Sequence, residues 1–226
     1  MPSFSAELMQ RAALSPRVVG LTFVASQPFK RLAGQYVVLS AGSGPTHAFS
    51  IASPFEPNAP GRFEIAAARA TTAQALLELP LGSVLDATGP GGNLVWQGNA
   101  PALLIATGTG ISPLRALIKE ELARATDSPL LLLFGSRDSS EELWGDELRE
   151  LSQKHARFRF WPTHSQPLPG YTGSEGHVQA HLAGAAQALG PELRAYVCGH
   201  TPMVRDCTAA LVAQGVLPEH IHGESY

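Results

Sequence analysis

The chain has 226 residues, of which 44% are hydrophobic and 15% are charged; this composition excludes a disordered protein and allows one large folded domain or two small ones. Its formal net charge of -3 gives no broad basic surface, which argues against a nucleic-acid partner. The two cysteines are too few for a disulfide framework or for the four thiolates that usually hold an iron-sulfur cluster.

The N-terminal segment, residues 1–16, does not have the continuous apolar stretch of a secretory signal, because Glu7 and Arg11 interrupt it. No apolar run in the chain approaches the roughly 20 residues that a membrane-spanning helix needs. We therefore expect no membrane span and a cytoplasmic protein.

Short β-like runs fill the first part of the chain, and glycine, proline and asparagine separate them. The runs occupy residues 17–25, 34–40, 47–53, 62–70 and 83–89, and one short helical piece lies at 72–79. This pattern predicts a small antiparallel barrel or sandwich.

The pattern changes near residue 98. Apolar strands at 101–107, 129–135, 157–163 and 193–199 follow, and amphipathic helices at 112–125, 139–154 and 201–215 alternate with them. Such an alternation predicts a parallel sheet that helices cover on both faces. The sequence thus predicts two domains, 1–98 and 99–226.

The segment TGTGISP joins the first of these apolar strands to its helix. Ligands of open parallel sheets collect at such junctions. Gly108 and Gly110 let the backbone approach a pyrophosphate, and a helix that begins near Ser112 and Pro113 points free N–H groups at it. A tight turn without a ligand fits the same residues, and a lone Gly-x-Gly does not decide between the two.

Six segments together resemble the ferredoxin-NADP reductase family. They stand in the family's order: GQYVVL at 34–39, HAFSIAS at 47–53, GPGGN at 89–93, GTGISP at 108–113, YVCGHTPMV at 196–204 and GESY at 223–226. The resemblance covers nearly the whole chain. It implies a Greek-key antiparallel β-barrel that binds flavin, followed by a Rossmann-like α/β domain that binds a nicotinamide nucleotide.

The activity that the resemblance implies is hydride transfer from NADH or NADPH to a bound flavin, followed by electron transfer to a separate acceptor such as a ferredoxin, an oxygenase component or a haem protein. Two alternatives stay open: a reductase that uses free flavin as its substrate, and a nucleotide-binding electron-transfer subunit without turnover of its own. The presence of Ser50, Cys198 and Glu224 favours an enzyme, because a subunit without turnover would be expected to lose them.

The flavin contacts that the resemblance implies are His47, Ala48, Phe49, Ser50, Thr71, Thr72 and Tyr226. Phe49 would lie along the flavin, the Ser50 hydroxyl would hydrogen-bond near N5, and Tyr226 would stack on the exposed flavin face until the nicotinamide displaces it. His47 stands where the family has a phosphate-binding arginine, and since histidine loses its charge near neutral pH, we expect flavin binding to weaken as the pH rises. FAD is the implied cofactor; FMN or a loosely held flavin stays open.

The nucleotide contacts that the resemblance implies are Gly108, Thr109, Gly110, Pro113, Ser136, Arg137, Cys198, Gly199, Pro202 and Met203. Cys198 would pack near C4 of the nicotinamide, where Gly199 gives it room, and Glu224 would lie beside the ring. Ser50, Cys198, Glu224 and Tyr226 form the implied catalytic set.

The choice between NADH and NADPH is open. Ser136 and Arg137 offer a place for a 2′-phosphate, but Asp138 beside them would repel it. Gln166 follows Ser165 in the region where NADPH-preferring members of the family often have arginine. These residues favour NADH.

Two histidine pairs have spacings that a metal site can use. His177 and His181 would share a helix face, and His220 and His222 would share a strand face. Since the first pair has no third ligand, and the second is no stronger, we expect no metal site. The motifs of nucleophile-elbow hydrolases and P-loop proteins do not occur in the chain, which argues against both classes.

Overall fold

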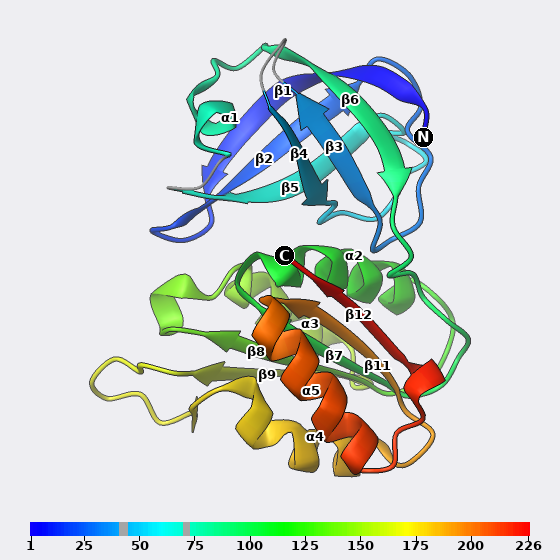
Figure 1. Cartoon of the computed structure of the whole chain (residues 1–226), viewed down its shortest axis with the longest axis vertical. Coiled ribbons are helices and arrows are strands. Elements are labelled where there is room, and N and C mark those ends of the chain that lie inside the picture. Colours follow the sequence, from blue (N-terminus) through cyan, green and yellow to red (C-terminus); the bar gives the residue numbers. More distant parts are fainter. Residues whose placement is uncertain (41–44, 70–72) are drawn as a thin grey trace.

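The computed structural model describes residues 1–40, 45–69 and 73–226. These residues form two units, an antiparallel barrel and a helix-covered parallel sheet, which lie one above the other in Figure 1. The chain passes from the first unit to the second between Gly91 and Ala102. The predicted fold class, a β-barrel followed by an α/β unit, is confirmed.

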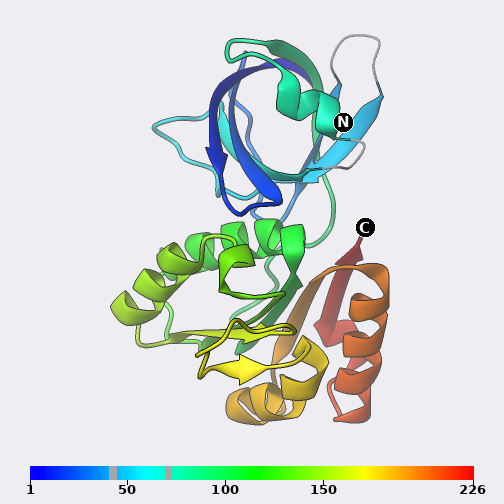
Figure 2. The same cartoon turned by 90° about the vertical axis from the view of Figure 1, so that its left-hand side faces the viewer.

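Six strands of the described residues form the barrel sheet in the order β4-β3-β6-β1-β2-β5, and each neighbouring pair is antiparallel. Their bounds are Ser3–Ala13 (β1), Val18–Ala25 (β2), Tyr36–Ser40 (β3), Thr46–Ser50 (β4), Arg62–Ala68 (β5) and Val84–Gly91 (β6), and the short helix α1 spans Gln74–Glu78. A bridge between Ile51 and Ile65 connects the end of β4 to β5, the two edges of the sheet. The sheet therefore closes into a barrel, and Figure 2 shows its strands curving around in a ring.

Alternate side chains of the strands fill the barrel, because every second residue of a strand points to the same face. Leu21 and Phe23 of β2 are almost fully buried, and Phe23 stacks on Phe63 of β5 with ring centroids 5.4 Å apart. Strand β1 was absent from the sequence prediction. Only Ala6 and Leu8 are buried in it, so its apolar alternation is too short to be recognised.

The second unit is a parallel sheet in the order β10-β9-β8-β7-β11-β12. Its strands are Ala102–Thr107 (β7), Leu130–Ser136 (β8), Phe158–His164 (β9), Ser174–Glu175 (β10), Arg194–Gly199 (β11) and Ile221–Ser225 (β12). Its α-helices are Ile111–Leu122 (α2), Gly145–Lys154 (α3), Leu182–Leu189 (α4) and Thr201–Ala213 (α5), and its 3-10 helices are Gly108–Gly110 (η1), Ser139–Glu141 (η2), Val178–His181 (η3) and Pro218–His220 (η4).

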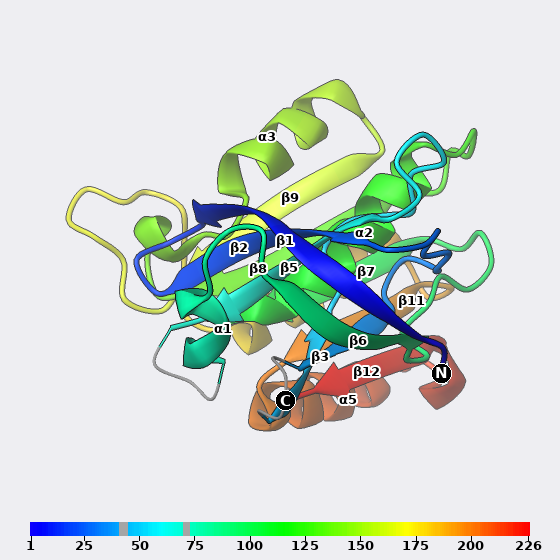
Figure 3. The same cartoon turned by 90° about the horizontal axis from the view of Figure 1, so that it is seen from above.

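The helices cover both faces of this sheet, as predicted. Side chains of α2 and α3 pack in one apolar cluster with the strands, and side chains of α4 and α5 pack in another with residues from the opposite face. In the view from above, α3 and α5 project on opposite sides of the molecule and α2 lies under the barrel strands (Figure 3).

Two of the helix predictions were wrong. The predicted helix at 139–154 is divided into η2 and α3, because Trp144 between them adopts a left-handed conformation with φ of 53°. His177 and His181 do not share an α-helix face, since His177 precedes the four-residue 3-10 helix η3 and His181 ends it.

The two units share one apolar cluster. Val18 and Ala66 of the barrel, with Ala33 and Leu94 from the segments around it, are buried together with α2 residues such as Leu114. The interface is therefore continuous with the core of the second unit. No helix within residues 1–40, 45–69 and 73–226 combines the length and apolar character needed to cross a lipid bilayer.

Candidate functional site

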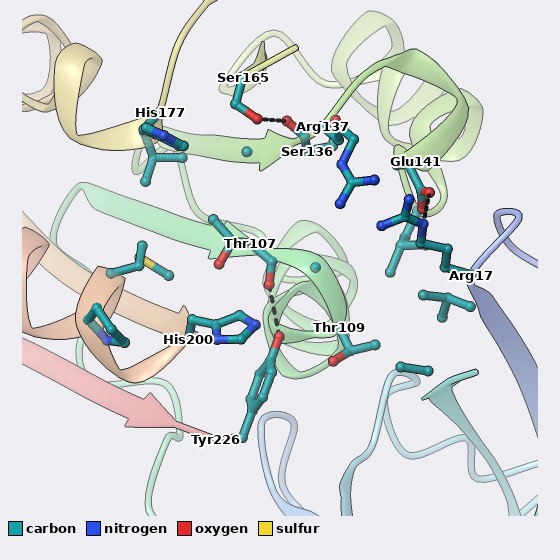
Figure 4. Close-up of a pocket in the computed structure, with 18 of the residues that line it drawn as sticks. Arg17, Thr107, Thr109, Ser136, Arg137, Glu141, Ser165, His177, His200 and Tyr226 are labelled. Atoms are coloured by element: carbon teal, nitrogen blue, oxygen red, sulfur yellow. Dashed lines mark hydrogen bonds and ion pairs between the residues drawn. The ribbon is translucent and has the colours of Figure 1, made fainter. Parts of the chain in front are cut away.

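A cavity of about 670 Å³ opens between the barrel and the carboxyl ends of the parallel strands (Figure 4). The residues that line it are Arg17, Val18, Ala68, Thr107, Gly108, Thr109, Gly135, Ser136, Arg137, Glu141, Leu143, Ser165, Gly176, His177, Val178, Gln179, His200, Pro202, Met203 and Tyr226. Most of them lie in the last residues of the parallel strands or in the segments that follow them, and three come from the barrel. The cavity therefore lies where open parallel sheets bind their ligands, and it has the size of a small-molecule site.

The glycine turn forms one wall of this cavity, and its two glycines serve different purposes. Gly108 has φ of +54°, a left-handed conformation that glycine adopts without a penalty. Gly110 has an ordinary helical φ, but a Cβ atom there would lie 2.5 Å from the carbonyl carbon of Cys198 and 2.8 Å from Cα of Gly199. The turn thus requires Gly110 because its backbone packs directly against β11. Pro113 is buried in the first turn of α2 and is not part of the cavity wall.

Tyr226 reaches into the cavity from the end of β12. Its hydroxyl accepts a hydrogen bond from the Gly110 N–H at 3.0 Å and donates one to the Thr107 carbonyl, also at 3.0 Å. Burial of this hydroxyl raises its pKa, although 56% of the side chain as a whole is exposed. The ring lies 5.7 Å from that of His200, centroid to centroid. The hydroxyl therefore occupies a turn N–H that the sequence analysis assigned to a phosphate.

Cys198 lies beside this turn and is only 1% exposed. Burial, together with the nearby Glu224 carboxyl, raises the pKa of its thiol to about 12, so the sulfur carries a proton at neutral pH. Glu224 of β12 stands in register with Cys198 of β11, and burial raises the pKa of its carboxyl as well. The structure thus brings these two predicted residues together, just behind the cavity wall.

Position 199, the last residue of β11, also requires glycine, because its surroundings leave no room for a side chain. A Cβ atom there would contact Oγ1 of Thr107 and would lie 2.6 Å from Cε of Met203. Met203 and Pro202 belong to the first turn of α5 and line the cavity, as expected of nucleotide contacts. Cys207, one turn further along α5, is buried with its sulfur 3.6 Å from that of Met203 and belongs to the core.

At its other end the cavity is lined by Ser136 and Arg137 after β8 and by Ser165 after β9. Arg137 is exposed. The Asp138 carboxylate accepts hydrogen bonds from the N–H and the hydroxyl of Ser140, and these bonds lower its pKa. Asp138 therefore caps η2 and is not part of the wall. Asp138 keeps its negative charge next to Arg137, so the repulsion of a 2′-phosphate that the sequence predicts for it stays a prediction.

Four charged or titratable residues that line this cavity were not predicted as site residues: Arg17, Glu141, His177 and His200. Arg17, in the turn between β1 and β2, reaches across from the barrel and pairs with Glu141 at 3.2 Å, and the hydroxyl of Ser15 donates to the same carboxylate. His177 and His200 line the cavity from the segments before η3 and α5. His200 stands next to the Cys198–Gly199 motif, which was a usable signal, whereas nothing in the local sequence around Arg17 marks it.

The predicted flavin residues lie on β4 of the barrel. His47 and Phe49 share one face of the strand, as alternation requires, with their rings 6.3 Å apart, while Ala48 is exposed and Ser50 is half-buried. Phe49 packs in the apolar core of the barrel and is 9% exposed. Its flavin contact stays a prediction, since the ring also serves as a core residue. Thr71 and Thr72 lie outside the described residues.

The histidine pairs have other partners. His181 lies 3.0 Å from the hydroxyl of Thr163, and His222 packs against Tyr196 with the two rings tilted and their centroids 5.2 Å apart. Within the described residues, no three His, Cys, Asp or Glu side chains gather as a metal site would require.

Comparison with known proteins bears on the whole chain. Residues 104–209 match the family model of the oxidoreductase NAD-binding domain. The chain is 34% identical to ferredoxin-NADP reductase B of Sorangium cellulosum over 241 residues, which cover 99% of this chain and 97% of that protein. It is 28% identical to the phenol hydroxylase P5 protein of Acinetobacter pittii, and this match covers 99% of this chain and 65% of that protein.

Solved structures share the same architecture. A cytochrome P450 reductase from Amycolatopsis has a TM-score of 0.89 at 25% identity, with 99% of this chain and 69% of that chain covered. A ferredoxin NADP+ reductase from Neisseria gonorrhoeae, solved with bound FAD and NADP, has a TM-score of 0.83 at 21% identity, with 100% of this chain and 99% of that chain covered. The order of barrel and parallel sheet is thus that of known two-unit proteins.

Proposed function

The chain belongs to the ferredoxin-NADP reductase family of flavin-dependent oxidoreductases, and we propose that it passes hydride from NADH or NADPH to a bound FAD and then passes electrons to a separate acceptor protein. The observation that carries the proposal is the cavity at the strand ends, which opens toward the barrel in a chain that matches a ferredoxin-NADP reductase over nearly its full length. The boundary between the flavin and nucleotide units lies near residue 98, and the protein is cytoplasmic.

The residues around β4 and the C-terminus fit a flavin. The face of β4 formed by Ala48 and Ser50 combines a small exposed side chain with a half-buried hydroxyl. Tyr226 ends the chain on the side of the parallel sheet that faces the β3–β4 hairpin, and its ring is exposed enough to accept a planar partner (Figures 1 and 2). FAD bound between them supplies the chemistry of taking up hydride and releasing single electrons.

The nucleotide is held by the backbone of the glycine turn and by the polar end of the cavity. The N–H groups at the start of α2 bind the pyrophosphate, since a helix N-terminus favours negative charge. Ser136 and Arg137 bind the ribose end of the adenosine. Thr109, Pro202 and Met203 line the path between the turn and α5.

Tyr226 excludes the nucleotide until it moves. Because its hydroxyl bonds to Gly110 and Thr107, an entering pyrophosphate competes with the tyrosine for the same turn. Tyr226 thus orders the events: the tyrosine leaves the turn, the pyrophosphate takes its place, and the nicotinamide would then be free to approach the flavin.

Cys198, Glu224 and Ser50 shape the place of hydride transfer. A protonated thiol presents a compact and uncharged surface to the nicotinamide, so Cys198 packs against the ring rather than acting as a nucleophile. Glu224, with its raised pKa, provides a carboxyl beside it that donates or accepts a hydrogen bond. The Ser50 hydroxyl offers a hydrogen bond on the barrel side.

The acceptor is a ferredoxin, an oxygenase component or a haem protein. Relatives include a ferredoxin-NADP reductase and a phenol hydroxylase component, and the chain contains too few cysteines to hold an iron-sulfur cluster in the usual way. A bound flavin would therefore pass its electrons to a partner that carries its own redox centre.

An absorbance spectrum of the purified protein tests the proposal, followed by anaerobic addition of NADH and, separately, NADPH. We expect a flavin spectrum that one or both nucleotides bleach, and the faster nucleotide is the preferred one. A colourless protein that oxidises nucleotide only when free flavin is added would instead identify a flavin reductase with diffusible flavin. A coloured protein that neither nucleotide reduces would contradict the proposal.

A further inference from the structure

A buried arginine links the two units at their interface. Arg115 lies on α2, and its side chain is 6% exposed. Its Nη1 donates to the Ala52 carbonyl at 2.7 Å and to the Glu64 carboxylate at 2.9 Å, both in the barrel unit. Its Nε and Nη2 contact the carboxylate of Glu147 on α3 at 2.9 and 2.8 Å. We call Arg115, Ala52, Glu64 and Glu147 the interdomain clamp.

The two carboxylates of the clamp each pair with a second basic residue outside it. Glu64 also pairs with Arg62 at 2.9 Å, and Glu147 pairs with Lys119 at 2.9 Å. Burial alone would raise the pKa of Glu147, but the charges and hydrogen bonds of Arg115 and Lys119 outweigh it and hold the pKa below its usual value. The clamp is therefore a satisfied network, in which each buried charge has partners.

Trp144 shows that the surrounding loop is shaped around this arginine. Its ring lies 4.7 Å from the Arg115 guanidinium carbon. It is the only non-glycine residue with a positive φ in the described part of the chain. A bulky residue is rarely held in this conformation unless its surroundings fix it. The bend at Trp144 interrupts the helical pattern before α3, and both the indole ring and Glu147 contact the Arg115 guanidinium.

The clamp connects the two halves of the proposed site by short segments. Ala52 follows Ser50 by two residues, and its N–H donates to the Glu64 carbonyl at 2.7 Å, so Arg115 holds two barrel positions that are bonded to each other. On the other side, Arg115 follows Gly110 by five residues on the helix that begins at the glycine turn. Arg115 thus connects the segment that follows β4, the strand of the proposed flavin site, to the helix that begins at the glycine turn.

Other contacts across the interface are weaker or join fewer groups: the Ser15 hydroxyl donates to Glu141 at 2.9 Å, and the Ala33 N–H donates to Glu120 at 3.4 Å. The shared apolar cluster resists separation but does not by itself fix rotation or sliding, since hydrophobic burial has no direction. The Arg17–Glu141 pair also spans the units, but the Arg17 side chain is 57% exposed, and such pairs are weak in water. A guanidinium has five donors in a rigid plane, and in Arg115 they point to partners on both units.

We propose that Arg115 is a positioning residue that fixes the two units at the separation and angle needed for hydride transfer. This inference rests on the proposed function. Reacting atoms must approach to about 3–3.5 Å, and an error of about 1 Å can slow a reaction a hundredfold. Loss of the clamp should therefore reduce the rate of the hydride step, with little effect on the binding of flavin or nucleotide, because Arg115 lines neither site.

The first experiment measures flavin bleaching by NADH or NADPH in anaerobic stopped flow, with the flavin-loaded wild type and the Arg115→Lys variant. Lysine keeps the positive charge but lacks the planar guanidinium that donates hydrogen bonds to both units. We expect at least a tenfold lower limiting rate at saturating nucleotide, with flavin content and nucleotide Kd within twofold of wild type. Arg124→Lys is the matched control, since Arg124 lies two residues after the end of α2 and forms ion pairs only with Glu120 and Glu121 among the described residues. The hydride-transfer rate of this variant should not change.

Two further variants separate positioning from folding. Glu64→Gln weakens the link to the barrel, whereas Glu147→Gln weakens only a contact within the second unit. We expect Glu64→Gln to lower the hydride-transfer rate more than Glu147→Gln does, even if both lower the melting temperature equally. Equal rates in the two variants, or a wild-type rate in both Glu64→Gln and Arg115→Lys, would overturn the proposal.

A distance measurement tests the clamp without relying on turnover. Spin labels on cysteines introduced at Met9 and Val212, one exposed position in each unit, report the distance between the units, because the native Cys198 and Cys207 are buried. The distance distribution should be narrow in the wild type and in Arg124→Lys, and broader in Arg115→Lys and Glu64→Gln. An unchanged distribution in Arg115→Lys would overturn the clamp. If neither nucleotide bleaches the wild type, the proposed function fails, and this distribution still decides whether Arg115 fixes the units.

Discussion

The two units of this protein build their proposed sites in different ways. In the parallel-sheet unit, the cavity wall is largely a product of the backbone: strand ends, the left-handed Gly108, and glycines that let β11 and the turn pack together. In the barrel, the proposed flavin site depends on individual side chains of β4, and one of them, Phe49, is also a core residue.

This difference explains why the structure shows a formed cavity in the parallel-sheet unit, whereas the flavin site of the barrel stays a prediction. A turn between a parallel strand and a helix has its geometry before any ligand binds, because the hydrogen bonds of the sheet and helix fix it. The side chains on a barrel strand, by contrast, are not held in one arrangement by backbone hydrogen bonds, and they form a common site only when a ligand contacts them. The comparison therefore predicts that backbone changes in the second unit have the largest effects.

Gly110→Ala, which adds one methyl group, should have the largest effect on stability and activity of the substitutions considered. The added Cβ would collide with the backbone of Cys198 and Gly199, which cannot rotate away as a side chain can. We expect a loss of roughly 3 kcal/mol of stability and loss of reduction by nucleotide. Urea unfolding followed by circular dichroism measures the first effect, and anaerobic bleaching measures the second.

Gly184→Ala provides the control for this substitution. Gly184 lies within α4, and its added Cβ would meet only Trp161 at an ordinary 3.6 Å. Alanine is the better helix former by roughly 0.5–1 kcal/mol, so this variant should be as stable as the wild type or more so. If both variants lost the same stability, the backbone packing assigned to Gly110 would be wrong.

Tyr226→Phe should strengthen nucleotide binding. The substitution removes the hydrogen bonds to Gly110 and Thr107 and leaves the ring in place, so the turn N–H becomes free for a phosphate. Each neutral hydrogen bond contributes about 1 kcal/mol, and we expect the Kd of the preferred nucleotide to fall about tenfold. A fluorescence titration measures it. An unchanged or higher Kd would show that the tyrosine does not compete for the turn.

The sequence predicted the fold well where pattern and geometry agree. Apolar strands alternating with helices led directly to the parallel sheet, because a strand buried on both faces has no polar alternation. The strand β1 and the break at Trp144 were missed for local reasons. Only two side chains of β1 are buried, and a tryptophan gives no signal for a left-handed turn that tertiary contacts impose.

The sequence predicted those residues of the candidate site that directly follow a predicted strand, and it missed those whose partners are distant in the chain. Gly108, Thr109, Ser136 and Arg137 follow predicted strands directly, and the structure brings them to one cavity. Arg17 and the Arg115 network were not predicted, because their partners are 124 and 51 residues away in the chain and only the packing of the two units brings them together. The roles of Ser50, His47 and Phe49 toward flavin stay predictions.

Arg137→Ala tests how much a side chain adds to the backbone-built site. With Asp138 turned to Ser140, the exposed guanidinium at the end of β8 is available for a 2′-phosphate. We expect the Kd of NADPH to rise about fivefold, or about 1 kcal/mol, and that of NADH to change less. Titration with both nucleotides measures the difference. Equal weakening of the two would place Arg137 at a phosphate that they share.

The smallest expected effect lies at the boundary between the units, in the dependence of stability on pH. Because Glu147 has a lowered pKa in the folded protein, its contribution is complete above the ordinary value of 4.5 and is lost as the pH falls below it through the folded pKa. Since the side chain is 29% exposed, solvent screening should keep this contribution below about 1 kcal/mol.

Glu147→Gln should therefore flatten the decline of the melting temperature between about pH 5 and pH 3, whereas Glu150→Gln, which removes an exposed carboxylate paired only with Lys154 among the described residues, should leave that decline unchanged. A decline that is equally steep in the wild type and both variants would mean that Glu147 has the same pKa in the folded and unfolded chain. The ion pairs with Arg115 and Lys119 would then stabilise the charged form no better than water does, and the rigidity of the interface would have to come from its apolar cluster.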